Sequence, residues 1–112
     1  MRKREILTQE LVHFRQNTTG DYNSAFGQEA LYSNTTGDGN TALGFASLQQ
    51  NTDGANNTAS GYNSLGLNTS GFANSAFGYD ALSSNNFGDA NTAIGEGALK
   101  SNTSGSFNTA AG

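Results

Sequence analysis

Large apolar side chains recur at fixed intervals in a chain that is otherwise rich in Asn, Thr, Ser and Gly. A leucine stands at every seventeenth residue from Leu31 to Leu99, and an alanine precedes each of them by six residues. The alanine lies in a short stretch of the form Asn-Ser/Thr-Ala-variable-Gly, as in residues 40–44. Such a stretch predicts a strand, in which successive side chains point to opposite faces. The chain is therefore expected to contain one short strand in every seventeen residues.

The sequence from Asn17 onward is a 17-residue repeat, with five complete copies and a shortened sixth. Counted from the leading asparagine, six positions never vary: Asn at positions 1 and 7, Gly at 4 and 11, Ala at 9 and Leu at 15. A fixed period of this size is typical of a solenoid, in which each repeat contacts mainly its neighbours. Helical repeats are excluded, because each glycine in a helix would cost about 1 kcal/mol. We therefore predict an all-β solenoid of parallel strands over residues 17–112.

Alternation along the strand separates two ladders of side chains. Position 10 is mostly bulky, so we expect it to point into the interior together with the leucine of position 15. The predicted core is Leu31, Leu48, Leu65, Leu82, Leu99, Phe26, Leu43, Phe77 and Ile94. The invariant alanine would then face outward, where a second chain in close contact would explain the absence of larger residues. The predicted subunit interface is Ala25, Ala42, Ala59, Ala76, Ala93 and Ala110.

The invariant Gly and Asn positions are predicted to be structural. Polar residues before the glycine of position 4 favour a turn with positive φ at that glycine. The glycine of position 11 indicates a second turn or a close approach of two backbones. Asparagines that stack above one another can hydrogen-bond to their equivalents in neighbouring repeats, as in other stacked β structures.

Composition and charge narrow the class of function. Only 34% of the residues are apolar and no Cys is present, so a single chain has few means of stabilising a core and oligomerisation is favoured. Residues 1–16 carry four basic and two acidic side chains (net +2), whereas residues 17–112 carry one basic and seven acidic (net −6). This acidic surface disfavours nucleic-acid binding. No apolar run is long enough to insert into a membrane, and Glu5, Gln9 and Glu10 interrupt the core that a signal peptide would need.

Side chains suited to catalysis or metal binding are sparse. His13 is the only histidine, and without Cys or a second His there is no evident nucleophile and base pair. Asp21, Asp38 and Asp89 share position 5, but other repeats carry Ala, Phe or Ser there, which disfavours a ladder of calcium ligands. We therefore expect no enzymatic activity, no catalytic residue, no cofactor and no metal site.

The strand motifs NTALGFASL (40–48) and NSAFGYDAL (74–82), which follow NTTGD and NTSG turns, resemble the head repeats of YadA-type trimeric autotransporter adhesins. Similar repeats occur in phage tail-fibre and tailspike proteins. The resemblance covers residues 17–112, although the period is longer than the adhesin unit and the valine before the alanine is missing. It implies a left-handed parallel β-roll in which three identical chains pack side by side.

Residues 1–16 are predicted to form a separate cap or joint. Leu7, Leu11 and Phe14 have the spacing of a short amphipathic helix. This segment would either cap the solenoid and start the trimer, or dock on the open end of the next molecule to build a head-to-tail fibre. The apolar residues of the predicted joint are Ile6, Leu7, Leu11, Val12 and Phe14.

Three surface features are candidates for recognition. Hydroxyl groups recur at positions 2 and 8, as in Thr35 and Thr41, and such ladders could contact ice or a polysaccharide. Exposed aromatic side chains could stack on sugars or line the contact between subunits. These aromatic residues are Tyr22, Tyr32, Phe45, Tyr62, Phe72, Tyr79, Phe87 and Phe107. N-glycosylation sequons begin at Asn17, Asn34, Asn56, Asn68 and Asn102.

These observations predict a non-enzymatic structural subunit of an extracellular trimeric fibre or filament that adheres through its repeated surface ladders. The partner would be the protein itself, with a surface receptor or glycan as a further candidate, at the cell surface or on a virion fibre. The first alternative is a capped adhesin or phage tail-fibre head that binds a receptor. The second alternative is an ice- or polysaccharide-binding solenoid.

Overall fold

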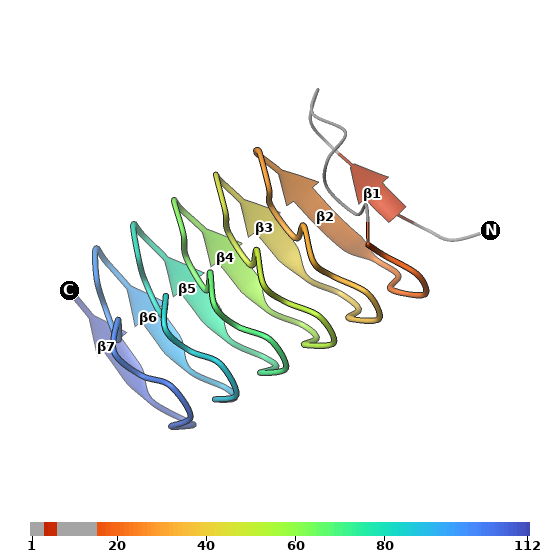
Figure 1. Ribbon diagram of the computed structural model, residues 1–112. Coiled ribbons are helices and arrows are strands. Elements are labelled where there is room, and N and C mark those ends of the chain that lie inside the picture. Colours follow the sequence, from red (N-terminus) through yellow and green to blue (C-terminus); the bar gives the residue numbers. More distant parts are fainter. Residues whose placement is uncertain (1–3, 7–15) are drawn as a thin grey trace.

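The computed structural model describes residues 4–6 and 16–112, which form a parallel β-solenoid (Figure 1). The strands of this part lie in chain order in one parallel sheet, and each pairs with the next. No residue of the described part is helical. The predicted all-β fold with parallel strands at a 17-residue spacing is therefore confirmed. The strands are β1 (Arg4–Ile6), β2 (Asn23–Phe26), β3 (Thr41–Leu43), β4 (Thr58–Ser60), β5 (Ser75–Phe77), β6 (Thr92–Ile94) and β7 (Thr109–Ala111).

Equivalent positions of successive repeats lie side by side, so each repeat forms one coil of the solenoid. Thr41 pairs with Thr58, and the same seventeen-residue offset holds from β2 to β7. In contrast, Arg4 of β1 pairs with Asn23, nineteen residues away. Ile6 of the predicted joint thus lies in a strand. The rest of that joint, and with it the predicted helix, lies outside the described residues: Leu7, Leu11, Val12 and Phe14.

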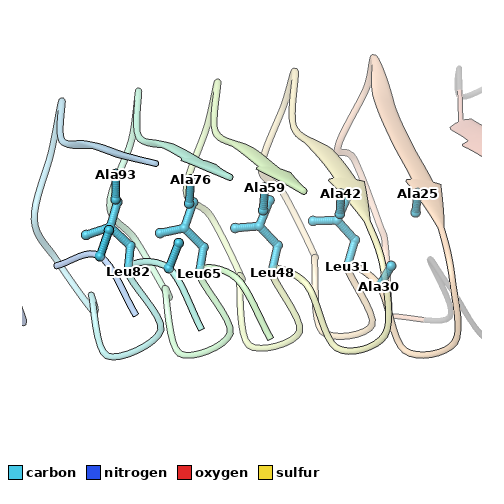
Figure 2. Packing of buried hydrophobic residues seen from close by; sticks show 12 residues of the cluster. Ala25, Ala30, Leu31, Ala42, Leu48, Ala59, Leu65, Ala76, Leu82 and Ala93 are labelled. Carbon is cyan, nitrogen blue, oxygen red and sulfur yellow. The ribbon is translucent and has the colours of Figure 1, made fainter. Parts of the chain in front are cut away.

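The interior of the coils is filled by the alanine of position 9 and the leucine of position 15, which Figure 2 shows pointing toward each other. Leu99 and Ala110, near one end of the stack, pack against this cluster. The predicted leucine core is confirmed by these buried side chains. The members with no exposed surface are Leu31, Leu48, Leu65, Leu82, Ala25, Ala42, Ala59, Ala76 and Ala93.

Position 10 lies outside the coil, so its predicted place in the core is wrong. Phe26, Leu43, Phe77 and Ile94 are each 42–52% exposed. Alternation shows that positions 9 and 10 face opposite sides, but it does not say which side is the interior. The space available inside the coil determines which position faces inward. The solenoid measures only 15 Å in its shortest dimension, and leucines and asparagines already occupy the interior. Only a methyl group fits opposite them. The alanine ladder predicted as a subunit interface is instead the inner wall of the coil: Ala25, Ala42, Ala59, Ala76, Ala93 and Ala110.

Two ladders of asparagines complete the interior. At position 1, Asn51 Nδ2 donates to Asn34 Oδ1 at 2.8 Å and to the Gly54 carbonyl at 3.0 Å. At position 7, Asn57 Nδ2 donates to the Gly71 carbonyl at 2.8 Å, and the Asn74 amide donates to Asn57 Oδ1 at 2.9 Å. Buried polar groups need such partners. The structural role predicted for both asparagine positions is confirmed.

The two invariant glycines are required for different reasons. At position 4, a Cβ on Gly54 would lie 2.5 Å from the Gly71 carbonyl oxygen, so the next coil leaves no room for a side chain. Gly54 has no positive φ, and the positive φ predicted for position 4 is wrong. At position 11, Gly61 has φ +133° and its Cβ would lie 2.7 Å from the Gly78 carbonyl oxygen. Position 11 therefore meets both predictions, a turn and a close approach.

The coils also bend at residues other than glycine that adopt left-handed backbone conformations. In one coil these are Ala73 (φ 60°), Asp80 (φ 59°) and Leu82 (φ 51°), at positions 6, 13 and 15. A residue with a Cβ is strained by about 1–2 kcal/mol in this conformation. The strain repeats in every coil, so the packing of the interior must outweigh it.

Replacing Ala73 with Gly should stabilise the protein by up to about 1 kcal/mol, because Gly removes the strain at φ 60° and the side chain is exposed. The matched change is Ala76→Gly, three residues later, where the alanine is buried in strand β5. That variant should lose about 1 kcal/mol. Urea unfolding measures both, and an equal loss in the two variants would contradict the assignment of strain to Ala73.

Candidate interaction surface

Positions 8 and 10 of strands β2–β7 point away from the interior and form one continuous face, which we call the outer sheet face. Position 8 supplies a row of half-buried or exposed hydroxyl groups, and position 10 supplies a parallel row that is mainly apolar. The two rows lie next to each other because neighbouring strands pair in register. The outer sheet face consists of Ser24, Thr41, Thr58, Ser75, Thr92, Thr109, Phe26, Leu43, Ser60, Phe77, Ile94 and Ala111.

Apolar side chains gathered on one face of a surface indicate a contact site more strongly than scattered apolar residues do. Ser60 interrupts this row between Leu43 and Phe77 on the two neighbouring strands. The hydroxyls of Thr41 and Thr58 make no hydrogen bond to other described residues, so they remain available to a partner. The face can therefore bury apolar surface and form hydrogen bonds at the same time.

A stack of three aromatic rings follows the strands at position 12. The rings of Phe45 and Tyr62 are 5.4 Å apart at 16°, and those of Tyr62 and Tyr79 are 5.2 Å apart at 11°. Stacking covers the ring faces of Tyr62 with its neighbours and leaves ring edges and hydroxyl groups exposed. Sugars pack on ring faces, so Tyr62 at the centre of this ladder offers them none. The consecutive aromatic residues at position 12 are the sequence signal that could have identified this stack.

The other predicted ladders mainly connect neighbouring coils. At position 2, Thr35 Oγ1 donates to the Thr52 carbonyl at 3.2 Å, so this hydroxyl row is bound to the next coil. At position 5, Asp38 Oδ1 accepts from the Asp21 amide at 2.8 Å. His13 lies outside the described residues. Within the described ranges, no cluster of His, Cys, Asp or Glu has the arrangement of a metal site.

The remaining predicted aromatic residues do not come together in one site. Tyr22 and Phe107 are at position 6, and Phe72 and Phe87 are at other exposed corners. Tyr32 is half-buried.

Residues 4–6 and 16–112 enclose no pocket. In the described part of the chain, no helix is long and apolar enough to cross a membrane.

The fold and its exposed face define a parallel β-solenoid repeat protein with a candidate contact surface on the outer side of its sheet. Comparison with models of protein families, with curated proteins and with solved structures gives no match. The likeness to adhesin head repeats therefore depends on the sequence motifs alone.

Proposed function

We propose that this protein is a non-enzymatic structural subunit of an extracellular fibre or filament. It assembles with two further copies through the outer sheet face and adheres through its repeated surface ladders. The observation that carries the proposal is the exposed row of Phe26, Leu43, Phe77 and Ile94, which a partner would cover. Full burial of such a side chain from water is favourable by about 1.5–3 kcal/mol, and because each is already about half-buried, association would gain roughly half of that per side chain. The motif resemblance to trimeric adhesins favours three copies.

The dimensions of the solenoid agree with a contact of this kind. It is 38 Å long with a cross-section of 22 × 15 Å, so one side covers about 570–840 Å², against about 800 Å² per partner in a standard interface. A stable contact would therefore use most of one side. Once copies associate, each surface ladder is present several times, and multivalency strengthens contacts that are individually weak.

Two alternatives remain as secondary proposals. A capped adhesin or phage tail-fibre head would use the same oligomer but bind one receptor or glycan. An ice- or polysaccharide-binding solenoid would use the hydroxyl row of the outer sheet face. The latter is less favoured, because bulky side chains of unequal size stand beside Thr41 and Thr92, and the Thr35 hydroxyl is bound to the next coil.

Light scattering on the purified protein should give a mass three times 11.6 kDa, and electron microscopy should show whether trimers join into fibres. Phe77→Lys should reduce the oligomer to monomer, because it places a charge in the apolar row. The matched change is Phe72→Lys, at an exposed corner outside this row, which should leave the mass unchanged. A wild-type monomer, or equal effects of both variants, would contradict assembly through the outer sheet face.

A further inference from the structure

The five sequons differ in whether a modifying enzyme could reach the asparagine amide. Asn34 and Asn68 have no exposed surface. Asn68 Nδ2 donates to Asn51 Oδ1 at 2.8 Å and to the Gly71 carbonyl at 3.0 Å, and Asn34 Nδ2 makes the equivalent bonds to the preceding coil and to Gly37. Modification of either amide requires the coil to open.

The sequons nearest the two ends of the stack are also engaged. Asn102 is half-buried, and its Nδ2 donates to Asn85 Oδ1 at 2.8 Å and to the Gly105 carbonyl at 3.0 Å. Asn17 is half-buried, and its Nδ2 donates to the Gly20 carbonyl at 3.0 Å. Both belong to the position-1 ladder. A substituent on Nδ2 would disturb the bond between coils that Asn102 makes and the turn bond that Asn17 makes within its own coil.

Asn56 is different, because it lies at position 6 and not in a ladder. Its backbone is anchored: φ is 59° and the amide donates to the Asp38 carbonyl at 2.9 Å. Its side chain is exposed, and its Nδ2 makes no hydrogen bond to any residue in the described ranges. The preceding coil has Gly39 at the same position, and a Cβ there would lie 2.6 Å from Asn56 Oδ1. Glycine thus leaves room for this side chain on the surface.

The third residue of the sequon is accessible too. Thr58 is half-exposed at position 8, whereas Asn57 between the two points into the coil. The amide that would be modified and the hydroxyl that defines the sequon are therefore both presented outside, and the buried residue between them holds the backbone in place.

We propose that Asn56 is a site of N-linked glycosylation in the folded protein. The donor is a sugar activated as a pyrophosphate ester. Nδ2 of Asn56 attacks the anomeric carbon, the bond from that carbon to the phosphate oxygen breaks, and the pyrophosphate leaves with the electron pair. Nδ2 loses one proton to a base of the transferase. Asn56 lies outside the outer sheet face but Thr58 belongs to it, so the transferase has to reach this sequon while that face is uncovered. The modification would place one sugar on the central coil of each chain.

The test uses unmodified, folded protein of the Phe77→Lys variant, in which the outer sheet face and Thr58 are uncovered, with a soluble N-glycosyltransferase and a nucleotide-activated hexose, followed by peptide mass spectrometry. Synthetic peptides spanning each of the five sequons serve as unfolded controls. In the folded protein, Asn56 should be modified at least about a hundredfold faster than Asn34 or Asn68, because those amides react only after local opening. In the peptides this difference should disappear.

Asn56→Gln should abolish the modification, and Thr58→Ala should do the same by removing the sequon while keeping the asparagine. Thr41→Ala changes the equivalent threonine outside any sequon and should leave the modification intact. The proposal is overturned if folded protein is modified at Asn34 or Asn68 as fast as at Asn56. It is equally overturned if Asn56 stays unmodified in the folded protein or in its own peptide.

Discussion

Replacing Asn68 with Asp should lower the free energy of unfolding by about 3–5 kcal/mol, although the two side chains have nearly the same shape. Asn68 is fully buried, and its Nδ2 donates to Asn51 Oδ1 and to the Gly71 carbonyl. A carboxylate would place an acceptor against two acceptors and bury an uncompensated charge. Because small proteins are stable by about 5–15 kcal/mol, a large share of the stability should be lost. Urea unfolding followed by circular dichroism measures it.

The matched control is Asn86→Asp, at position 2. Asn86 is half-buried, and its Oδ1 accepts a hydrogen bond from Thr69 Oγ1, which a carboxylate can also accept. The change should stay within about 0.5 kcal/mol of the wild type, as is usual for surface substitutions. Should Asn68→Asp be no more destabilising than this control, the asparagine ladder would not be a main source of stability.

Leu65→Ala should cost about 2–5 kcal/mol, because Leu65 is fully buried in the narrow interior and the thin coil has little material with which to fill the cavity. Leu65 has φ 52°, and Ala tolerates this conformation no better than Leu does, so the change reports packing and not backbone strain. Thermal and urea unfolding measure the loss.

Leu67→Ala provides the comparison two residues away. Leu67 is 52% exposed, so its truncation should cost less than about 1 kcal/mol. Similar losses in the two variants would mean that the leucine of position 15 has no special role in the core.

The period of the repeat was enough to predict the fold, because only stacked coils place equivalent residues such as Leu48 and Leu65 next to each other. It was also enough to predict hydrogen-bonded ladders of Asn51 and Asn57. The outward direction of Phe77 could not be predicted, since alternation relates two faces of a strand without naming the inner one. That choice depends on the thickness of the coil, which bends at left-handed residues that carry ordinary side chains, such as Leu82.

The candidate surface was only partly predictable for the same reason. Once the alanines are inside, position 10 becomes the exposed row, and the aromatic residues of position 12 become a stack. The distinction among the sequons required hydrogen bonds that no motif shows: Asn68 and Asn56 begin equally good triplets, but only one of the two amides is exposed.

Because every coil has the same interior, the fold tolerates length changes only in whole repeats of seventeen residues. Every buried ladder continues when a whole coil, such as residues 51–67, is inserted or removed, because Asn68 would then follow Gln50 just as Asn51 does. A length change that is not a multiple of seventeen would place polar residues opposite leucines in every later coil. Related chains could therefore differ in length by whole coils, while the unequal side chains of the outer sheet face, such as Ser60 and Phe77, would still distinguish one coil from the next.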